Sequence, residues 1–133
     1  MRNDLDTTLP ALKAALADYP GLAFAVLIGS RANGRASEAS DWDIAVQWQT
    51  VPDDPFEYFG RNETLRRALA KALEVSEARL DIVDLHRAGL TMRIAVVEEG
   101  IPLQGDDGLP WARFLTRTWR DMEHWMLEQR YAP

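Results

Sequence analysis

The sequence of 133 residues contains no cysteine and no long apolar stretch. Without cysteine, disulfide bonds, thiol nucleophiles and zinc-ribbon sites are excluded. No segment approaches the roughly 18 consecutive apolar residues of a transmembrane helix, and residues 2–4 do not resemble the start of a signal peptide. We therefore expect a cytoplasmic protein that does not associate with a membrane.

Positive charge and several common motifs are also lacking. The net charge is −6 and the pI is about 4.9, whereas a surface that binds extended nucleic acid needs a basic face. The P-loop, the dinucleotide-binding glycine pattern and the Gly-x-Ser-x-Gly pattern of hydrolases are missing. We therefore expect no extended nucleic-acid binding, and a hydrolase with Ser30 as nucleophile and His86 or His124 as base is disfavoured.

The residues that are present predict one α/β domain over residues 1–133. The apolar content of 47% suffices for one compact core but, at this length, not for two. The apolar periodicities predict a small mixed β-sheet with helices packed on it, whose core covers about residues 8–105. The expected helices span residues 8–18, 54–74, 91–99 and 110–130, and the expected strands 22–28, 41–48 and 80–85, with an extended segment at 101–103.

Gly29 and Ser30 follow the apolar run of residues 22–28, which predicts a buried strand that ends in a tight turn. Because glycine has no Cβ, the backbone there can approach a ligand closely and tolerates a positive φ. Residues 30–33 can begin a short helix whose N–H groups, with the Ser30 hydroxyl, donate to a phosphate. Alone, such a turn is more often an ordinary strand-to-helix connection capped by serine.

Ten residues separate Ser30 from the segment Asp41-Trp42-Asp43. From residue 41 to 48, bulky apolar residues occupy every second position, so both carboxylates leave one face of a strand while Trp42 and Trp48 are buried behind it. The two aspartate Cα atoms should lie about 6.6 Å apart, which lets the side chains share one or two hard cations such as Mg²⁺. An isolated Asp-x-Asp is more simply an exposed strand with two charges, but the preceding Gly-Ser makes the combination specific.

Gly29-Ser30, followed by ten residues and Asp41-x-Asp43, resembles the signature of the polymerase-beta-type nucleotidyltransferases. The order of elements across about residues 8–105 is similar to that of their minimal form, the MNT domain. The resemblance implies that Gly29 and Ser30 bind the nucleotide. Arg31, the next residue, is a further candidate for nucleotide binding because its charge attracts a triphosphate; the alternative is an ion pair with Glu38. The resemblance also implies that Mg²⁺, as two ions, is held by the paired acids and a third carboxylate.

Asp81 and Asp84 are the candidates for that third carboxylate, in the strand expected at residues 80–85. In the family the acid follows the first apolar residue of such a strand, so the resemblance points to Asp81 as the catalytic and metal-binding residue. Asp84 has the opposite parity and is expected to be a strand-end or capping acid, paired with Arg79 or Arg87. In the loop after Ser30, Arg35 either attracts a triphosphate or pairs with Glu38.

Many MNT proteins of bacteria and archaea are antitoxins paired with a HEPN-domain RNase toxin. The resemblance implies that AMP is transferred from ATP to a tyrosine hydroxyl near the active site of the toxin, which blocks RNA cleavage. Two alternatives stay open: an antitoxin that acts by steric binding without catalysis, and a nucleotidyltransferase with a small-molecule acceptor. Enzymes of the latter kind usually carry an acceptor-binding domain for which this chain has no room.

The last expected helix carries a wide aromatic stripe, most of which we expect to pack on the sheet. Trp111 is favoured as a core residue, whereas for Trp125 core and partner interface are equally open. The stripe comprises Trp111, Phe114, Leu115, Thr118, Trp119, Met122, Trp125 and Met126. The helix expected at 54–74 has a second apolar stripe, which includes Phe56, Phe59, Leu65, Leu69 and Leu73.

Overall fold

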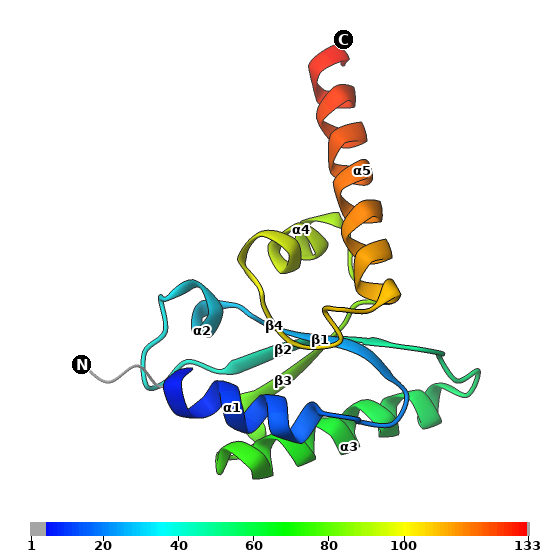
Figure 1. Ribbon diagram of the computed structural model, residues 1–133. Helices are drawn as coiled ribbons and strands as arrows, with labels where there is room; N and C mark the ends of the chain where they lie inside the picture. Colours follow the sequence, from blue (N-terminus) through cyan, green and yellow to red (C-terminus); the bar gives the residue numbers. More distant parts are fainter. Residues whose placement is uncertain (1–4, 133) are drawn as a thin grey trace.

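A computed structural model describes residues 5–132; the expectation for residues 2–4 lies outside this range. Most predicted helices and strands are confirmed, although the first helix begins at Leu5 rather than at residue 8. The elements in chain order are α1 (Leu5–Leu16), β1 (Leu22–Ile28), α2 (Ser30–Asn33), β2 (Trp42–Trp48), α3 (Pro55–Leu73), a 3₁₀ turn (Glu77–Arg79), β3 (Leu80–Asp84), α4 (Leu90–Glu99), β4 (Ile101–Gln104) and α5 (Leu109–Tyr131), as Figure 1 shows.

The four strands form one mixed sheet in the order β3-β2-β1-β4. β1 is antiparallel to both β2 and β4, whereas β2 and β3 are parallel. Parallel neighbours need a long crossover, and α3 supplies it here. The expected extended segment at 101–103 is the edge strand β4, so the predicted mixed sheet is confirmed.

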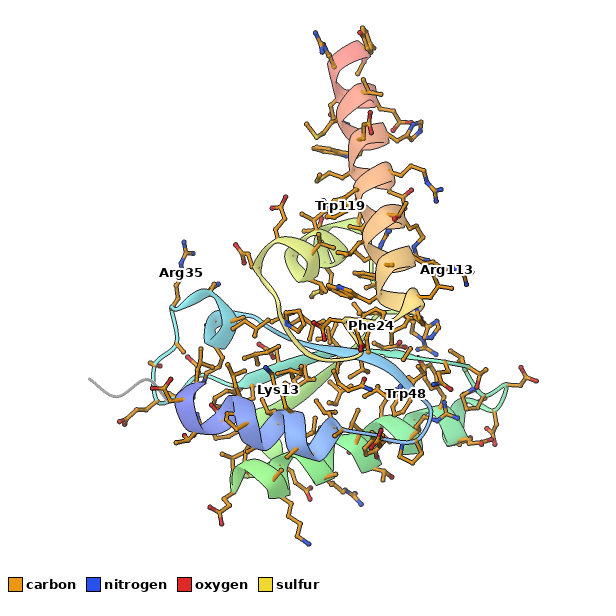
Figure 2. The ribbon with its side chains drawn as sticks, in the orientation of Figure 1. Lys13, Phe24, Arg35, Trp48, Arg113 and Trp119 are labelled. Carbon is orange, nitrogen blue, oxygen red and sulfur yellow. The ribbon has the colours of Figure 1, made fainter. Side chains whose placement is uncertain are left out.

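Helices cover both faces of the sheet (Figure 1). α1 and α3 lie on one face, where Leu12, Ile44 and Trp48 belong to the larger buried cluster. α4 and α5 lie on the other face, where Val96 and Phe114 pack on Phe24 and its neighbours. Figure 2 shows Trp48 and Phe24 on opposite sides of the sheet.

The N-terminus of α3 forms as the sequence predicts. The Asp54 side chain accepts a hydrogen bond of 3.0 Å from the Phe56 N–H, and a proline occupies the first turn. The predicted stripe is wrong at Phe56 and Phe59, whose side chains are 87% and 67% exposed. At roughly 100° per residue, they lie about 160° and 100° around the helix from Tyr58, which is buried in line with Leu65.

α5 packs on the sheet only through its first half. Phe114 and Thr118 are buried, and Trp111 stacks on Phe114 with ring centroids 5.7 Å apart, so the expected core position of Trp111 is confirmed. The helix then continues beyond the sheet (Figure 1). The expected packing of the stripe is confirmed for its first half, whose residues are buried or half-buried. It is wrong at Trp119, Trp125 and Met126, which are 50%, 51% and 56% exposed. None of the helices within residues 5–132 is long and apolar enough to cross a membrane.

Candidate active site

The turn after β1 is built around Gly29. Its φ of +77° lies in the left-handed region that favours glycine, and α2 begins at the next residue, Ser30. A Cβ added at Gly29 would lie 2.5 Å from Oδ2 of Asp43. Glycine is therefore required both for the backbone conformation and for the close approach of the turn to Asp43.

Asp43 and Asp81 lie side by side on the adjacent strands β2 and β3. The parallel register of β2 and β3 pairs Asp43 with Asp81, and Asp41 stands immediately before β2. Trp42 and Trp48, on the alternate parity, are 3% and 1% exposed, which confirms the predicted burial behind the strand. The acidic side chains thus leave the sheet face on which α4 and α5 pack.

The surroundings of Asp43 raise the pKa of its carboxyl group. Partial burial raises it above the ordinary value, and the negative charges of Asp81 and Asp41 raise it further. Each of these causes disfavours the ionised form of Asp43. A cation bound among the three side chains would offset both the repulsion and the cost of burying the charge.

The donor chemistry of this site suits Mg²⁺. No group of three His, Asp or Glu side chains within the described residues is placed so that all three could hold one metal ion. Mg²⁺ is commonly bound by only one or two carboxylates, with water and substrate phosphates as its other ligands. Asp43 and Asp81 provide such an incomplete set beside the Gly29 turn, with Asp41 close enough to act on the pKa of Asp43.

Asp84 has a different environment from Asp81. It accepts a hydrogen bond of 3.0 Å from the His86 N–H, and its Oδ2 lies 3.7 Å from Nε of Arg87. Together with burial, it also raises the pKa of Tyr58 on α3. The expected strand-end acid paired with Arg87 is confirmed, and the alternative pairing with Arg79 is not formed.

Arg79 instead stabilises the loop that leads into Asp41. Its guanidinium donates to the carbonyl oxygens of Glu38 and Ser40, the latter at 2.8 Å. Because Arg79 immediately precedes β3, this contact joins the strand that carries Asp81 to the loop that carries Asp41. Sequence reasoning missed this role, and its only signal was an arginine next to the acidic strand.

Arg31 contacts the same loop from the opposite side of β2. Its guanidinium donates to the Ser40 carbonyl at 2.9 Å and lies 4.2 Å from the ring centroid of Trp42. These contacts position the loop before Asp41, and nucleotide binding by Arg31 stays a prediction. Arg35 is exposed on the loop after α2 (Figure 2), and no ion pair joins it to Glu38 in the part of the chain that the structure describes.

Neither histidine contacts Ser30 within residues 5–132. His86 lies at the far end of β2, where a ring nitrogen is 3.0 Å from the Gln47 side chain and 3.2 Å from the Trp48 carbonyl. His124 is on α5 and contacts Glu128 at 3.2 Å. The hydrolase arrangement that the sequence disfavoured is therefore not assembled.

Comparison with known proteins gives consistent likenesses. The profile of the family described as polymerase beta, nucleotidyltransferase, matches residues 11–108. Protein adenylyltransferase MntA of Aphanizomenon flos-aquae (strain 2012/KM1/D3) is 27% identical over 77% of this chain and 69% of its own length. A chain in a crystal structure of a toxin–antitoxin with AMP-PNP is 27% identical, with a TM-score of 0.68 and 92% of each chain covered. A chain in the structure of tri-AMPylated Shewanella oneidensis HEPN toxin in complex with MNT antitoxin is 25% identical, with a TM-score of 0.63 and coverage of 94% of this chain and 92% of its own.

Proposed function

The chain belongs to the polymerase beta nucleotidyltransferase family, and we propose that it is an antitoxin that transfers AMP from ATP to a tyrosine hydroxyl of a HEPN-domain RNase toxin. The observation that carries the proposal is the contact of the Gly29 turn with Asp43, which itself faces Asp81. The likeness to a protein adenylyltransferase and to toxin–antitoxin structures supports the choice of donor and acceptor. The reaction would take place in the cytoplasm, the location expected from the sequence.

Asp41, Asp43 and Asp81 are the residues that would hold Mg²⁺, as two ions if the site follows other two-metal enzymes. When bound, Mg²⁺ supplies positive charge that stabilises the transferring phosphate and the leaving pyrophosphate. The pKa of Asp43 is raised by burial and by the two neighbouring carboxylates, so a bound cation would stabilise its ionised form.

Gly29 and Ser30 are proposed to position the phosphates of ATP. The missing side chain at Gly29 lets the backbone approach them, and the Ser30 hydroxyl adds a donor at the start of α2. Arg31, the next residue, is proposed to bind the nucleotide as well, and its contacts with Trp42 and Ser40 hold the loop before Asp41. Catalysis would rest on positioning and charge stabilisation, without a covalent enzyme intermediate.

The transfer forms one bond and breaks another at the α-phosphorus of ATP. The tyrosine oxygen bonds to this phosphorus while the bond to pyrophosphate breaks, and the hydroxyl proton is released. The modified toxin therefore carries a phosphodiester. Steric masking, the alternative, would leave the toxin chemically unchanged.

The two mechanisms differ in whether inhibition survives separation of the proteins. The HEPN-domain toxin proposed as the partner would be incubated with this chain, ATP and Mg²⁺, then purified under denaturing conditions and refolded. We expect its RNase activity to stay lost, because the phosphodiester survives denaturation. A sample treated in the same way without ATP is the control, and full recovery of activity in both samples would contradict the proposal.

A further inference from the structure

The second half of α5 exposes large apolar side chains over a long distance. Beyond α4 the helix stands away from the rest of the molecule (Figure 1). One side of it borders a hollow of about 390 Å³, lined by Trp119, Met122, Glu123, Met126, Leu127 and Arg130. We call these six residues the α5 face.

We propose that the α5 face is the surface that binds the toxin and holds it over the catalytic carboxylates. This inference rests on the proposed function, which requires a protein substrate, and it adds the docking surface to that function. Tryptophan and methionine are enriched in protein interfaces, and exposed tryptophans often contribute most of the binding energy.

We take the element that binds the α5 face to be a helix, because Trp119, Met122 and Met126 follow a three-and-four spacing along one side of α5. Residues 112, 116, 119, 123, 126 and 130 follow alternating steps of four and three and are all exposed. This repeat places one continuous line of side chains along α5, as in helices that pack against a partner helix. Trp119 and Met126 supply the apolar contacts, while Glu123 would meet basic side chains beside the apolar stripe of the partner.

Charge favours the toxin over a second copy of this chain. Each copy carries a net charge of −6, so two copies repel each other as whole molecules, although the α5 face itself pairs one acid, Glu123, with one base, Arg130. An RNase must bind a polyanion and therefore carries basic surface, which complements an acidic partner.

The location of α5 is suited to presenting a protein substrate. The helix packs on the sheet face from which Asp43 and Asp81 project. A toxin held along the α5 face would therefore lie on the same side of the sheet as the catalytic carboxylates. α1 and α3, on the other face, offer no such route to them.

The test compares two double variants that each remove exposed apolar side chains. Trp119→Ser with Met126→Ser alters the α5 face, whereas Phe56→Ser with Phe59→Ser alters α3 on the opposite face of the sheet. Calorimetric titration with the HEPN-domain toxin proposed as the partner measures binding. Separate titrations with Mg²⁺-ATP, and melting curves, show whether the nucleotide site and the fold are retained.

We expect the α5 variant to bind the HEPN protein about tenfold or more weakly, with nucleotide affinity and melting temperature like those of the parent. The α3 variant should bind like the parent. Equal binding by the parent and the α5 variant, or equal losses in both variants, would overturn the inference. So would an α5 variant that converts a dimer of this chain to a monomer without weakening the complex. If the parent binds through α5 but transfers no AMP, the proposed function fails while the docking surface stands.

Discussion

The two faces of β2 contribute differently to the molecule. On the face toward α1 and α3, Trp42 and Trp48 are almost fully buried. On the face toward α4 and α5, only Ala45 is buried, and Asp43 and Gln47 keep access to solvent. The same strand therefore supplies core packing on one side and the proposed catalytic groups on the other.

This division explains how the site can hold charges that repel each other. Burial of Asp43 beside Asp81 and Asp41 costs stability. The apolar side chains behind the strand offset that cost, because burying a large side chain contributes several kcal/mol. Substitutions on the two faces should therefore separate stability from activity.

The largest loss of stability is expected for Trp42→Ala. The substitution leaves a cavity behind β2 and removes the ring that Arg31 contacts. The free energy of unfolding should therefore fall by about 3–5 kcal/mol. Trp119→Ala on α5 is the matched control, because its side chain is half exposed, and its effect should be small. Chemical denaturation measures both. A Trp42 variant that is as stable as the parent but inactive would mean that this ring contacts the nucleotide.

Gly29→Ala should lower both stability and activity. With φ +77° and ψ −158°, Gly29 lies in a backbone region essentially restricted to glycine, so alanine there costs about 1–3 kcal/mol; the new Cβ would also displace the Asp43 carboxylate. Gly34→Ala is a close control, since Gly34 has a φ of +81° but no atom within 4 Å of an added Cβ. Both variants should be destabilised, and only Gly29→Ala should lose AMP transfer. Equal activity in the two variants would contradict the proposed role of the turn.

Arg79→Gln should weaken the site without unfolding it. It removes the hydrogen bonds that hold the loop before Asp41, and loss of such supporting contacts typically weakens metal binding roughly tenfold or more. The measurement is the Mg²⁺ concentration that half-saturates transfer. Arg67→Gln, at an exposed arginine on α3, controls for loss of charge. An unchanged Mg²⁺ requirement with a lower melting temperature would assign Arg79 a structural role only.

The smallest effect is expected for Asp43→Asn and depends on pH. Because the folded state raises the pKa of Asp43, the parent loses stability as the pH rises from about 3.9, the ordinary pKa of aspartate, through the folded value. The variant lacks this loss and should melt at a higher temperature than the parent at pH 7. Below about pH 3.9 the difference should vanish. A difference that is constant with pH would contradict the electrostatic account.

Sequence patterns sufficed where a feature depends on local chemistry. The parity of residues 41–48 predicted the burial of Trp42 and Trp48, and the cap at Asp54 predicted the start of α3. Contacts between distant segments were not predictable in this way. Arg79 reaches Ser40 only because β3 lies beside β2, and Trp119 is exposed only because α5 extends beyond the sheet.

The position of Asp81 beside Asp43 could be predicted only in part from the sequence. The resemblance selected Asp81 over Asp84, and the register of β2 and β3 places it opposite Asp43. Its catalytic role stays a prediction. The sequence signal for α5 was real but ambiguous, since a helix stripe of tryptophan and methionine suits a core as well as an interface.

The most direct test of AMP transfer is the intact mass of the toxin. The HEPN-domain protein would be expressed either with the parent chain or with the Asp41→Asn/Asp43→Asn variant, in which the fold should persist because repulsion is relieved. We predict that the parent chain adds the mass of one or more AMP units to the toxin, whereas the variant adds none. We also predict that the parent restores growth of the cells that express the toxin and that the variant does not. Rescue by the variant equal to that by the parent, with no added mass in either case, would contradict the account and leave binding as the function.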